Sequence, residues 1–160
     1  MNTTALILPL VLVTTLSVIA CDAGDAQPPR EPTIEPASNM KIQLTLQGKT
    51  VIATLHDTPS ARDFASMLPL TLALEDYSKT EKISDLPRKL TTKGAPAGAD
   101  PSVGDIAYYV PWGNLALYYR DFRYSEGLIL IGKLEGGAET LSVPGSVNVT
   151  IQLLGKDAPK

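Results

Sequence analysis

From Met40 onward, the chain is dominated by short segments in which hydrophobic and polar residues alternate. Lys41 to Gln47 alternates strictly, and Gly48-Lys49 separates it from a second alternating segment, Thr50 to His56. Such a pair around a short glycine-containing turn is typical of a β-hairpin. Further strands are predicted at Leu70 to Leu74, Ile106 to Val110, Leu115 to Tyr119, Leu128 to Leu134 and Val147 to Leu154. Many short strands of this kind predict a mainly β domain, either a barrel or a sandwich.

One helix is predicted directly after the second strand. Asp57 or Thr58 can cap its N-terminus, and Pro59 suits its first turn. Ser60 and Asp63 have the spacing of a capping box. The apolar stripe of this helix consists of Ala61, Phe64, Ala65 and Leu68, and Pro69 marks its end.

Two segments between the predicted strands have no clear period. Lys79 to Leu90 is interpreted as irregular, with at most one helical turn. Thr91 to Gly104 is rich in glycine and proline and is predicted to be a long loop.

The first residues differ from the rest of the chain, because Ala5 to Ala20 is apolar and contains no charged side chain. It suits a signal-peptide core better than a membrane-spanning helix. It ends in Val18-Ile19-Ala20-Cys21, which resembles a bacterial lipobox. The alternative is an ordinary secretory signal with a chance cysteine, and the segment before the apolar run, MNTT, carries no Lys or Arg.

The lipobox resemblance implies a signal peptide over residues 1–20 and lipidation at Cys21, the single cysteine of the chain. In lipoproteins of this kind the thiol takes a diacylglycerol and the new N-terminus takes an acyl chain such as palmitate. Several acyl chains hold a protein on a membrane nearly permanently. The expected location is therefore the bacterial cell membrane, with the domain outside the cytoplasm and facing the periplasm in a Gram-negative cell.

Residues 21–39 are predicted to be the lipidated cysteine and a proline-rich tether, because four prolines and a single isoleucine cannot build a core. The tether carries four acidic residues and one arginine, which accounts for the whole net charge of −3. The chain from Met40 onward is therefore neutral. The domain is placed at residues 40–155, and residues 156–160 are expected to be a flexible tail. A neutral domain without a basic run argues against nucleic acid as a partner.

Seven of the nine aromatic residues of the chain lie between Tyr108 and Tyr124. Alternation assigns Tyr108 and Tyr119 to the core face of their strands and Tyr109 and Tyr118 to the other face. With Trp112 and Asn114 in the turn, Tyr109 and Tyr118 form either a ligand-binding wall or ordinary sheet packing.

The order of these elements, with the blocks GDIAYY and PWGNLALYYRDFRY, resembles a small bacterial cyclophilin-like family of uncharacterised function. The resemblance implies a cyclophilin-like closed β-barrel with one or two short helices, and prolyl isomerase activity. Catalytic cyclophilins use an arginine on the strand after the helix, in an F-H-R type motif. This chain has Leu70-Thr-Leu-Ala-Leu there, so Arg88 and Arg120 are the remaining candidates for that role.

Other chemistry has little support in the sequence. His56 is the single histidine, so no histidine cluster is available for a metal, and we expect neither metal nor cofactor. We interpret the chain as a membrane-tethered module that binds a small molecule or a proline-containing peptide without catalysis, through Tyr109, Trp112, Asn114 and Tyr118. The alternative is a prolyl isomerase of the cell envelope with a non-standard arginine.

Overall fold

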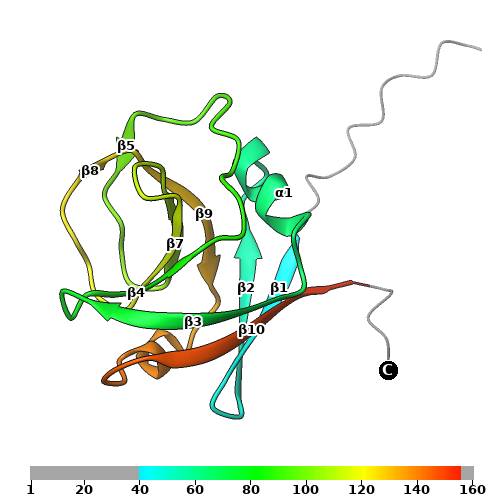
Figure 1. Ribbon diagram of the computed structural model, residues 1–160, viewed down its shortest axis with the longest axis vertical. Helices are drawn as coiled ribbons and strands as arrows, with labels where there is room; N and C mark the ends of the chain where they lie inside the picture. Colours follow the sequence, from blue (N-terminus) through cyan, green and yellow to red (C-terminus); the bar gives the residue numbers. More distant parts are fainter. Residues whose placement is uncertain (1–39, 156–160) are drawn as a thin grey trace, which may run out of the picture. The chain divides into compact units, whose positions relative to one another are not determined.

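Eight antiparallel strands of residues 40–155, the part of the chain that the computed structural model describes, close into a barrel (Figure 1). The order around the barrel is β1-β10-β3-β4-β7-β6-β9-β2. The strands are β1 (Lys41–Leu46), β2 (Lys49–Leu55), β3 (Leu70–Tyr77), β4 (Glu81–Asp85), β6 (Asp105–Tyr109), β7 (Asn114–Tyr118), β9 (Leu128–Leu134) and β10 (Val147–Leu154). Two further strands, β5 (Gly98–Ala99) and β8 (Ser125–Glu126), pair in a small separate sheet.

The seven strands predicted from alternation are all present, and the predicted mainly β barrel is confirmed. The interpretation of Lys79 to Leu90 as irregular is wrong, because this segment contains β4, which pairs with both β3 and β7. Its inward-facing residue is Lys82, which is fully buried beside Leu117 of β7. A lysine at an inward position removes the hydrophobic alternation that would have revealed the strand.

The hydrophobic core lies inside the barrel, and a second, smaller cluster lies on its outer face. The core includes Leu44, Leu74, Leu117 and Ile151, which are all fully buried. The outer cluster contains Ala107, Ala116, Tyr118 and Leu128, contributed by β6, β7 and the start of β9. Two clusters form because β6 and β7 are covered on both faces.

The helix α1 (Pro59–Ala65) begins where the sequence predicts it, with Thr58 at the N-cap. The Thr58 hydroxyl accepts a hydrogen bond from the Ala61 amide at 3.3 Å. The predicted capping box is not formed, because Ser60 donates to the Thr91 carbonyl and Asp63 accepts from the Thr91 amide, both at 2.7 Å. These two residues therefore hold the long loop against the helix. A short 3₁₀ helix, η1 (Ala138–Leu141), precedes β10.

The predicted signal peptide, the lipidation site Cys21, the tether and the tail lie outside the described residues. Within residues 40–155, no helix is long and apolar enough to span a bilayer.

Candidate functional site

A pocket of about 300 Å³ lies on the outer face of the barrel, over β4 and β7. All four residues predicted to bind a ligand, Tyr109, Trp112, Asn114 and Tyr118, line it. The other lining residues are Tyr77, Ser78, Glu81, Ile83, Ala116, Phe122, Arg123, Ser125 and Leu128. The structure thus brings the predicted residues together around one space.

Strand register explains how β7 contributes to both the core and the pocket. Leu115 and Leu117 point into the barrel and are fully buried, whereas Asn114, Ala116 and Tyr118 line the pocket. Alternate side chains of a strand lie on opposite faces, so one pentapeptide supplies both surfaces. The small side chain of Ala116 lies between two larger ones and leaves the floor of the pocket open.

Trp112 lies in the turn between β6 and β7, and its ring meets two tyrosines of the pocket. Its centroid is 5.4 Å from that of Tyr77, at an interplanar angle of 86°, and 5.4 Å from that of Tyr109, at 81°. Both pairs have the edge-to-face geometry that aromatic quadrupoles favour. Gly113 follows with a φ of 75°, a conformation that glycine adopts without strain. Trp112 still exposes 54% of its surface, so it borders the pocket without sealing it.

Two buried oxygen atoms of the pocket, Glu81 Oε2 and Asn114 Oδ1, have no hydrogen-bond partner among the described residues. Glu81 is 9% exposed and Asn114 is 3% exposed. Burial raises the pKa of the Glu81 carboxyl, and the Tyr118 hydroxyl partly opposes this shift. Burial also raises the pKa of Tyr118, and the neighbouring Glu81 adds to the increase. Buried polar atoms without partners are uncommon in folded proteins, and both oxygens can accept hydrogen bonds from a group that enters the pocket.

Sequence reasoning missed Glu81, since it belongs to the strand that was interpreted as irregular. Its position on the outer face follows from the register, in which Glu81 is opposite both Tyr77 of β3 and Tyr118 of β7. The alternation of Glu81 and Ile83 was the signal that could have found it.

The candidate arginines have different surroundings. Arg123 lines the pocket, and its guanidinium lies 5.5 Å from the centroid of the Phe122 ring. Arg120 is not among the lining residues, and its amide donates to the Thr80 carbonyl at 3.2 Å.

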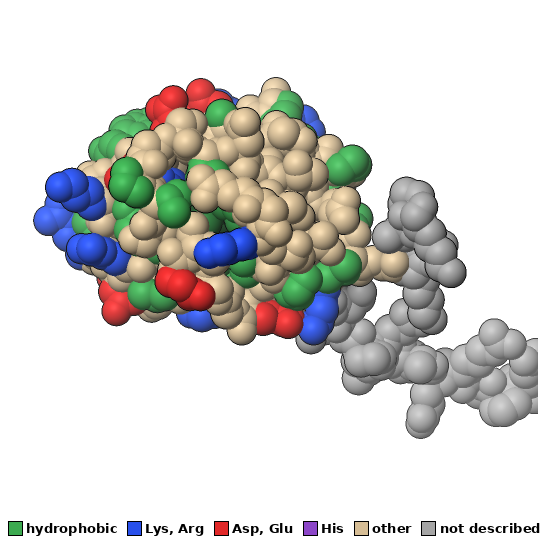
Figure 2. Space-filling view, turned by 90° about the horizontal axis from the view of Figure 1, so that it is seen from below, with side chains coloured by type: hydrophobic (Ala, Val, Ile, Leu, Met, Phe, Trp, Pro, Cys, Tyr) green, Lys and Arg blue, Asp and Glu red, His purple; other side chains and the backbone are tan. Residues whose placement is uncertain are grey.

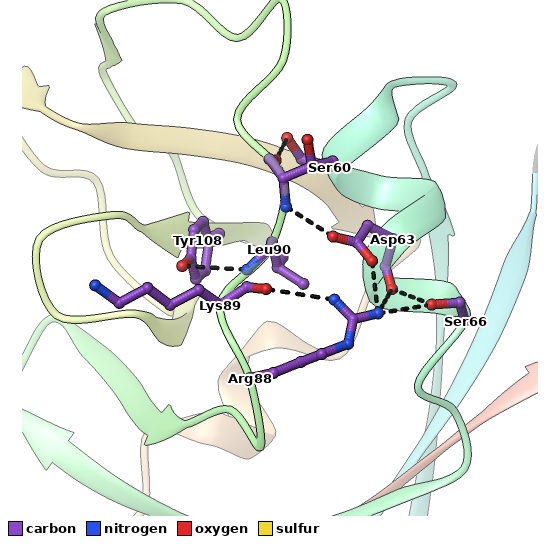
Figure 3. A network of polar contacts seen from close by, with 8 residues as sticks. Ser60, Asp63, Ser66, Arg88, Lys89, Leu90 and Tyr108 are labelled. Carbon is purple, nitrogen blue, oxygen red and sulfur yellow. Dashed lines mark hydrogen bonds and ion pairs between the residues drawn. The ribbon is translucent and has the colours of Figure 1, made fainter.

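Arg88 belongs to a polar network at α1, which Figure 3 shows from close by. It donates to Asp63 Oδ1 at 2.6 Å and to the Ser66 hydroxyl at 3.0 Å. The hydrogen bond from Arg88 lowers the pKa of Asp63, and the Thr91 amide lowers it further. Two residues along the chain, the Leu90 amide donates to the Tyr108 hydroxyl at 3.3 Å. Arg88 therefore fastens the segment after β4 to the helix, and it does not line the pocket.

The sequence pattern of the cyclophilin-like family matches residues 44–152, which is more than half of the chain. The chain belongs to the cyclophilin-like family. A similar solved structure is the solution structure of the hypothetical protein AF2241 from Archaeoglobus fulgidus. It is 17% identical, with a TM-score of 0.55 over 74% of this chain and 97% of that one, and at this identity the likeness shows the fold alone. None of the curated proteins compared with the chain matches it.

The strand after the helix, β3, has the sequence LTLALEDY and carries no arginine. Among residues 40–155, no group of three or more His, Cys, Asp or Glu side chains is arranged to hold a metal ion. His56 lies at the end of β2, where its Nδ1 is 3.3 Å from the Leu130 carbonyl oxygen.

The two tyrosines assigned to the core face of this cyclophilin-like barrel are found there. Tyr108 is 1% exposed, and Tyr119 is partly buried against the core. The Tyr119 hydroxyl donates to Asp76 at 2.6 Å. Burial and the Asp76 carboxylate raise the pKa of Tyr119 to about 12.

Proposed function

We propose that this chain is a membrane-tethered cyclophilin-like domain that binds a small molecule or a peptide in its outer pocket without catalysing a reaction on it. The observation that carries the proposal is the combination of aromatic walls with two buried acceptor atoms that lack partners, Glu81 Oε2 and Asn114 Oδ1. Ligand pockets are usually apolar and aromatic, with a few polar groups that orient the ligand. A pocket of about 300 Å³ is at the small end of the usual range.

The single tryptophan of the chain allows a direct test, because Trp112 borders the pocket. Native mass spectrometry of the full chain, purified from membranes, should detect a bound mass. Titration with proline-containing tetrapeptides should then show whether a peptide changes Trp112 fluorescence. We expect Ala116→Phe, which fills the floor, to abolish both signals. The control Leu153→Phe, at an exposed position of β10, should retain them. Equal signals in the two variants, or none in the unmodified chain, would contradict the proposal.

The second candidate function is prolyl isomerisation, and the observation that favours it is Arg123 at the pocket wall. An arginine that hydrogen-bonds near the prolyl nitrogen can lower a rotation barrier of about 18–20 kcal/mol. We expect proline tetrapeptides to isomerise at the uncatalysed rate in the presence of the chain. Acceleration that is lost in Arg123→Ala would establish the enzyme instead. Arg88→Ala and Arg120→Ala would test the two arginines that the sequence suggested.

We also propose that Cys21 anchors the chain in the bacterial cell membrane, with the domain outside the cytoplasm. The support is the lipobox-like Val18-Ile19-Ala20-Cys21 and the apolar segment before it. Mass spectrometry of the mature chain should find an N-terminal Cys21 carrying diacylglycerol and acyl groups. Cys21→Ala should move the chain from the membrane to the soluble fraction. A mature N-terminus elsewhere, without acyl mass, would disprove the anchor.

A further inference from the structure

The buried carboxyl of Glu81 has a defined place in the floor of the pocket. It lies in a row across three strands, between Tyr77 of β3 and Tyr118 of β7, and these three residues all line the pocket. Oε2 of Glu81 is buried and has no donor within the described residues. A carboxylate taken out of water without a compensating partner is strongly disfavoured. The Tyr118 hydroxyl offsets only part of this cost, and Oε2 has no donor of its own that would stabilise the charge of Glu81.

Two cations lie close to Glu81, Lys82 beside it in the sequence and Arg123 on the pocket wall, and both contact other groups. Lys82 points into the barrel, where its Nζ donates to the Val143 and Gly145 carbonyls at 2.5 and 2.7 Å. Arg123 lies over the Phe122 ring. None of the ion pairs among residues 40–155 includes Glu81. Glu81 is thus unpaired among these groups, and a ligand that carries a cation can supply the missing donor to its Oε2.

The rings of the pocket suit a cation as well as an apolar group. Trp112 stands nearly perpendicular to both Tyr77 and Tyr109, so the three rings border the space from different directions. Aromatic faces attract ammonium groups, with tryptophan the strongest, and the attraction grows when water is excluded. Rings and a carboxyl together favour a cation more than either does alone.

The rest of the floor indicates what the cation is attached to. Glu81 and Asn114 lie at opposite ends of the β4–β7 register, four residues apart, which corresponds to about 13 Å along a strand. Between them the floor is apolar and consists of Ile83 and Ala116. An aliphatic chain fits this middle part, and the second free acceptor, Asn114 Oδ1, can receive another donor at the far end.

We propose that the pocket takes a primary alkylammonium group, whose N–H donates to Glu81 Oε2 while its aliphatic stem lies over Ile83 and Ala116. This inference rests on the proposed function and gives the chemical class of its ligand. The ammonium can belong to a lysine side chain of a peptide or to a free amine, because both present the same group to Glu81.

The inference implies a dependence of affinity on pH. Four titratable or charged groups share the pocket with Glu81, namely Tyr77 of β3, Tyr109 of β6, Tyr118 of β7 and Arg123 of the following loop. Burial raises the pKa of Glu81 in the free protein, and an ammonium beside it would lower that pKa again. Alkylammonium affinity should therefore increase as pH rises through the pKa of Glu81. It should then stay level until the amine itself loses its proton, near pH 10.

The test is a titration of the full chain, followed by Trp112 fluorescence and calorimetry, with n-pentylammonium, 1-pentanol and pentanoate. We expect n-pentylammonium to bind at least about tenfold more tightly than 1-pentanol, because close charge pairs in protein interfaces contribute at least this much to affinity. Pentanoate should not bind. Nα-acetyl-lysinamide distinguishes a peptide lysine from a free amine as the source of the ammonium. If it binds more tightly than n-pentylammonium, the ligand is a peptide; if it binds more weakly, the ligand is a free amine.

Glu81→Gln keeps the size of the side chain and removes its charge. It should weaken n-pentylammonium binding at least about tenfold and remove the pH dependence, while 1-pentanol affinity stays within about twofold. The matched control is Glu75→Gln, because Glu75 is an exposed acid on β3 opposite Ile83 and outside the pocket lining. Urea unfolding reports whether Glu81→Gln is folded, and Glu81→Asp, which withdraws the carboxyl, replaces it if it is not.

Equal affinity for amine and alcohol, unchanged amine binding in Glu81→Gln, or no binding of any pentyl probe would overturn the inference. The proposed function would survive these results if a ligand is still bound and Ala116→Phe still abolishes its binding. An error in the proposed ligand class is thus distinguishable from an error in the proposal that the pocket binds a ligand.

Discussion

Lys82 combines complete burial with a positive charge, and its surroundings show how the barrel accommodates it. Its Nζ donates to the carbonyls of Val143 and Gly145 and lies 3.4 Å from Asp76. Through these contacts, β4 is attached to the segment before β10 and to β3. A buried cation is stable only when such partners compensate for lost hydration.

We predict that Lys82→Ala lowers the free energy of unfolding by about 3–4 kcal/mol, because it leaves a cavity and removes the hydrogen bonds. Lys82→Met fills the space again and should cost only about 1–2 kcal/mol. Lys41→Ala is the control, since Lys41 and Glu135 are 51% and 41% exposed in their ion pair, which should contribute at most about 1 kcal/mol. Urea unfolding measures all three. A Lys82→Met variant as stable as the unmodified chain would show that the carbonyl contacts give no net stabilisation.

Asp63 should make stability depend on pH. Its folded pKa lies below the usual value for an aspartate, first because Arg88 donates to it and second because the Thr91 amide does. A group with a lowered folded pKa contributes stability above its unfolded pKa, and the contribution is lost as pH falls through the folded pKa. Asp63→Asn should therefore cost about 1–2 kcal/mol at pH 7, and the cost should shrink as pH falls below about 4.

Urea unfolding of both chains between pH 2 and pH 7 checks this expectation. Asp57→Asn is the control, because Asp57 pairs with Arg62 where both side chains are about half exposed. A penalty for Asp63→Asn that stays constant over this range would contradict the role of the charge.

At the level of single residues, the sequence revealed the aromatic part of the pocket and missed its acid. Tyr109 and Tyr118 were predictable because alternation separates the two faces of β6 and β7. Trp112 and Asn114 were predictable because they were assigned to the turn between these strands. Glu81 was not, because its role depends on the pairing of β4 with β3 and β7. The alternation of Glu81 and Ile83 is short and is interrupted by the inward Lys82, and the β4–β7 pairing joins segments far apart in the chain.

At the level of elements, β9 shows how a glycine permits two strands to pack closely. Gly132 lies opposite Leu55 of β2 and Ile106 of β6, at the place where the β6–β9 register shifts. A Cβ atom there would be 2.8 Å from the Thr54 carbonyl oxygen and 3.2 Å from the Leu55 Cα. Both neighbours are backbone atoms, so they cannot move aside easily.

Gly132→Ala is therefore expected to lower the free energy of unfolding by about 1–3 kcal/mol, as overpacking of a tight core does. Gly155→Ala, where a Cβ meets nothing within 4 Å, should stay within about 0.5 kcal/mol of the unmodified chain. Thermal and urea unfolding compare the two variants. Equal stability of both would mean that β2 and β9 can separate slightly at no cost.

Alternation was sufficient to predict the elements that have a hydrophobic inner face, and insufficient for the one that does not. Besides the inward Lys82, β4 follows a turn in which Ser78 and Lys79 both have positive φ, 51° and 57°. Such turns usually contain Asn or Gly, so this hairpin lacks the usual sequence signal. Neither the turn before β4 nor the residues within it therefore carried the usual sequence signal of a strand.

At the scale of the molecule, closure of the barrel brings the two ends of the described domain together. Lys41 of β1 is the Cα partner of Leu154 of β10, so the domain begins and ends on adjacent strands. No strand of the barrel is left with a free edge, since β1 and β10 complete the ring. The fold therefore depends on the cyclic order of its strands more than on the position of its ends.

This dependence predicts that a circular permutant will fold. A short glycine-serine linker from Gly155 to Met40, with new ends at Gly94, opens an exposed loop where such changes are usually tolerated. We expect cooperative unfolding within about 2 kcal/mol of the unmodified chain, because no strand pair is interrupted. Opening the chain at Ala116 is the matched control. It cuts β7 in the middle, and because β7 pairs with both β4 and β6, this should prevent folding. Circular dichroism reports the barrel, and Trp112 fluorescence reports the pocket in the same sample. If the Gly94 permutant is also unfolded, the direct connection between β4 and β5 is required for the fold, and closure of the ring is not enough.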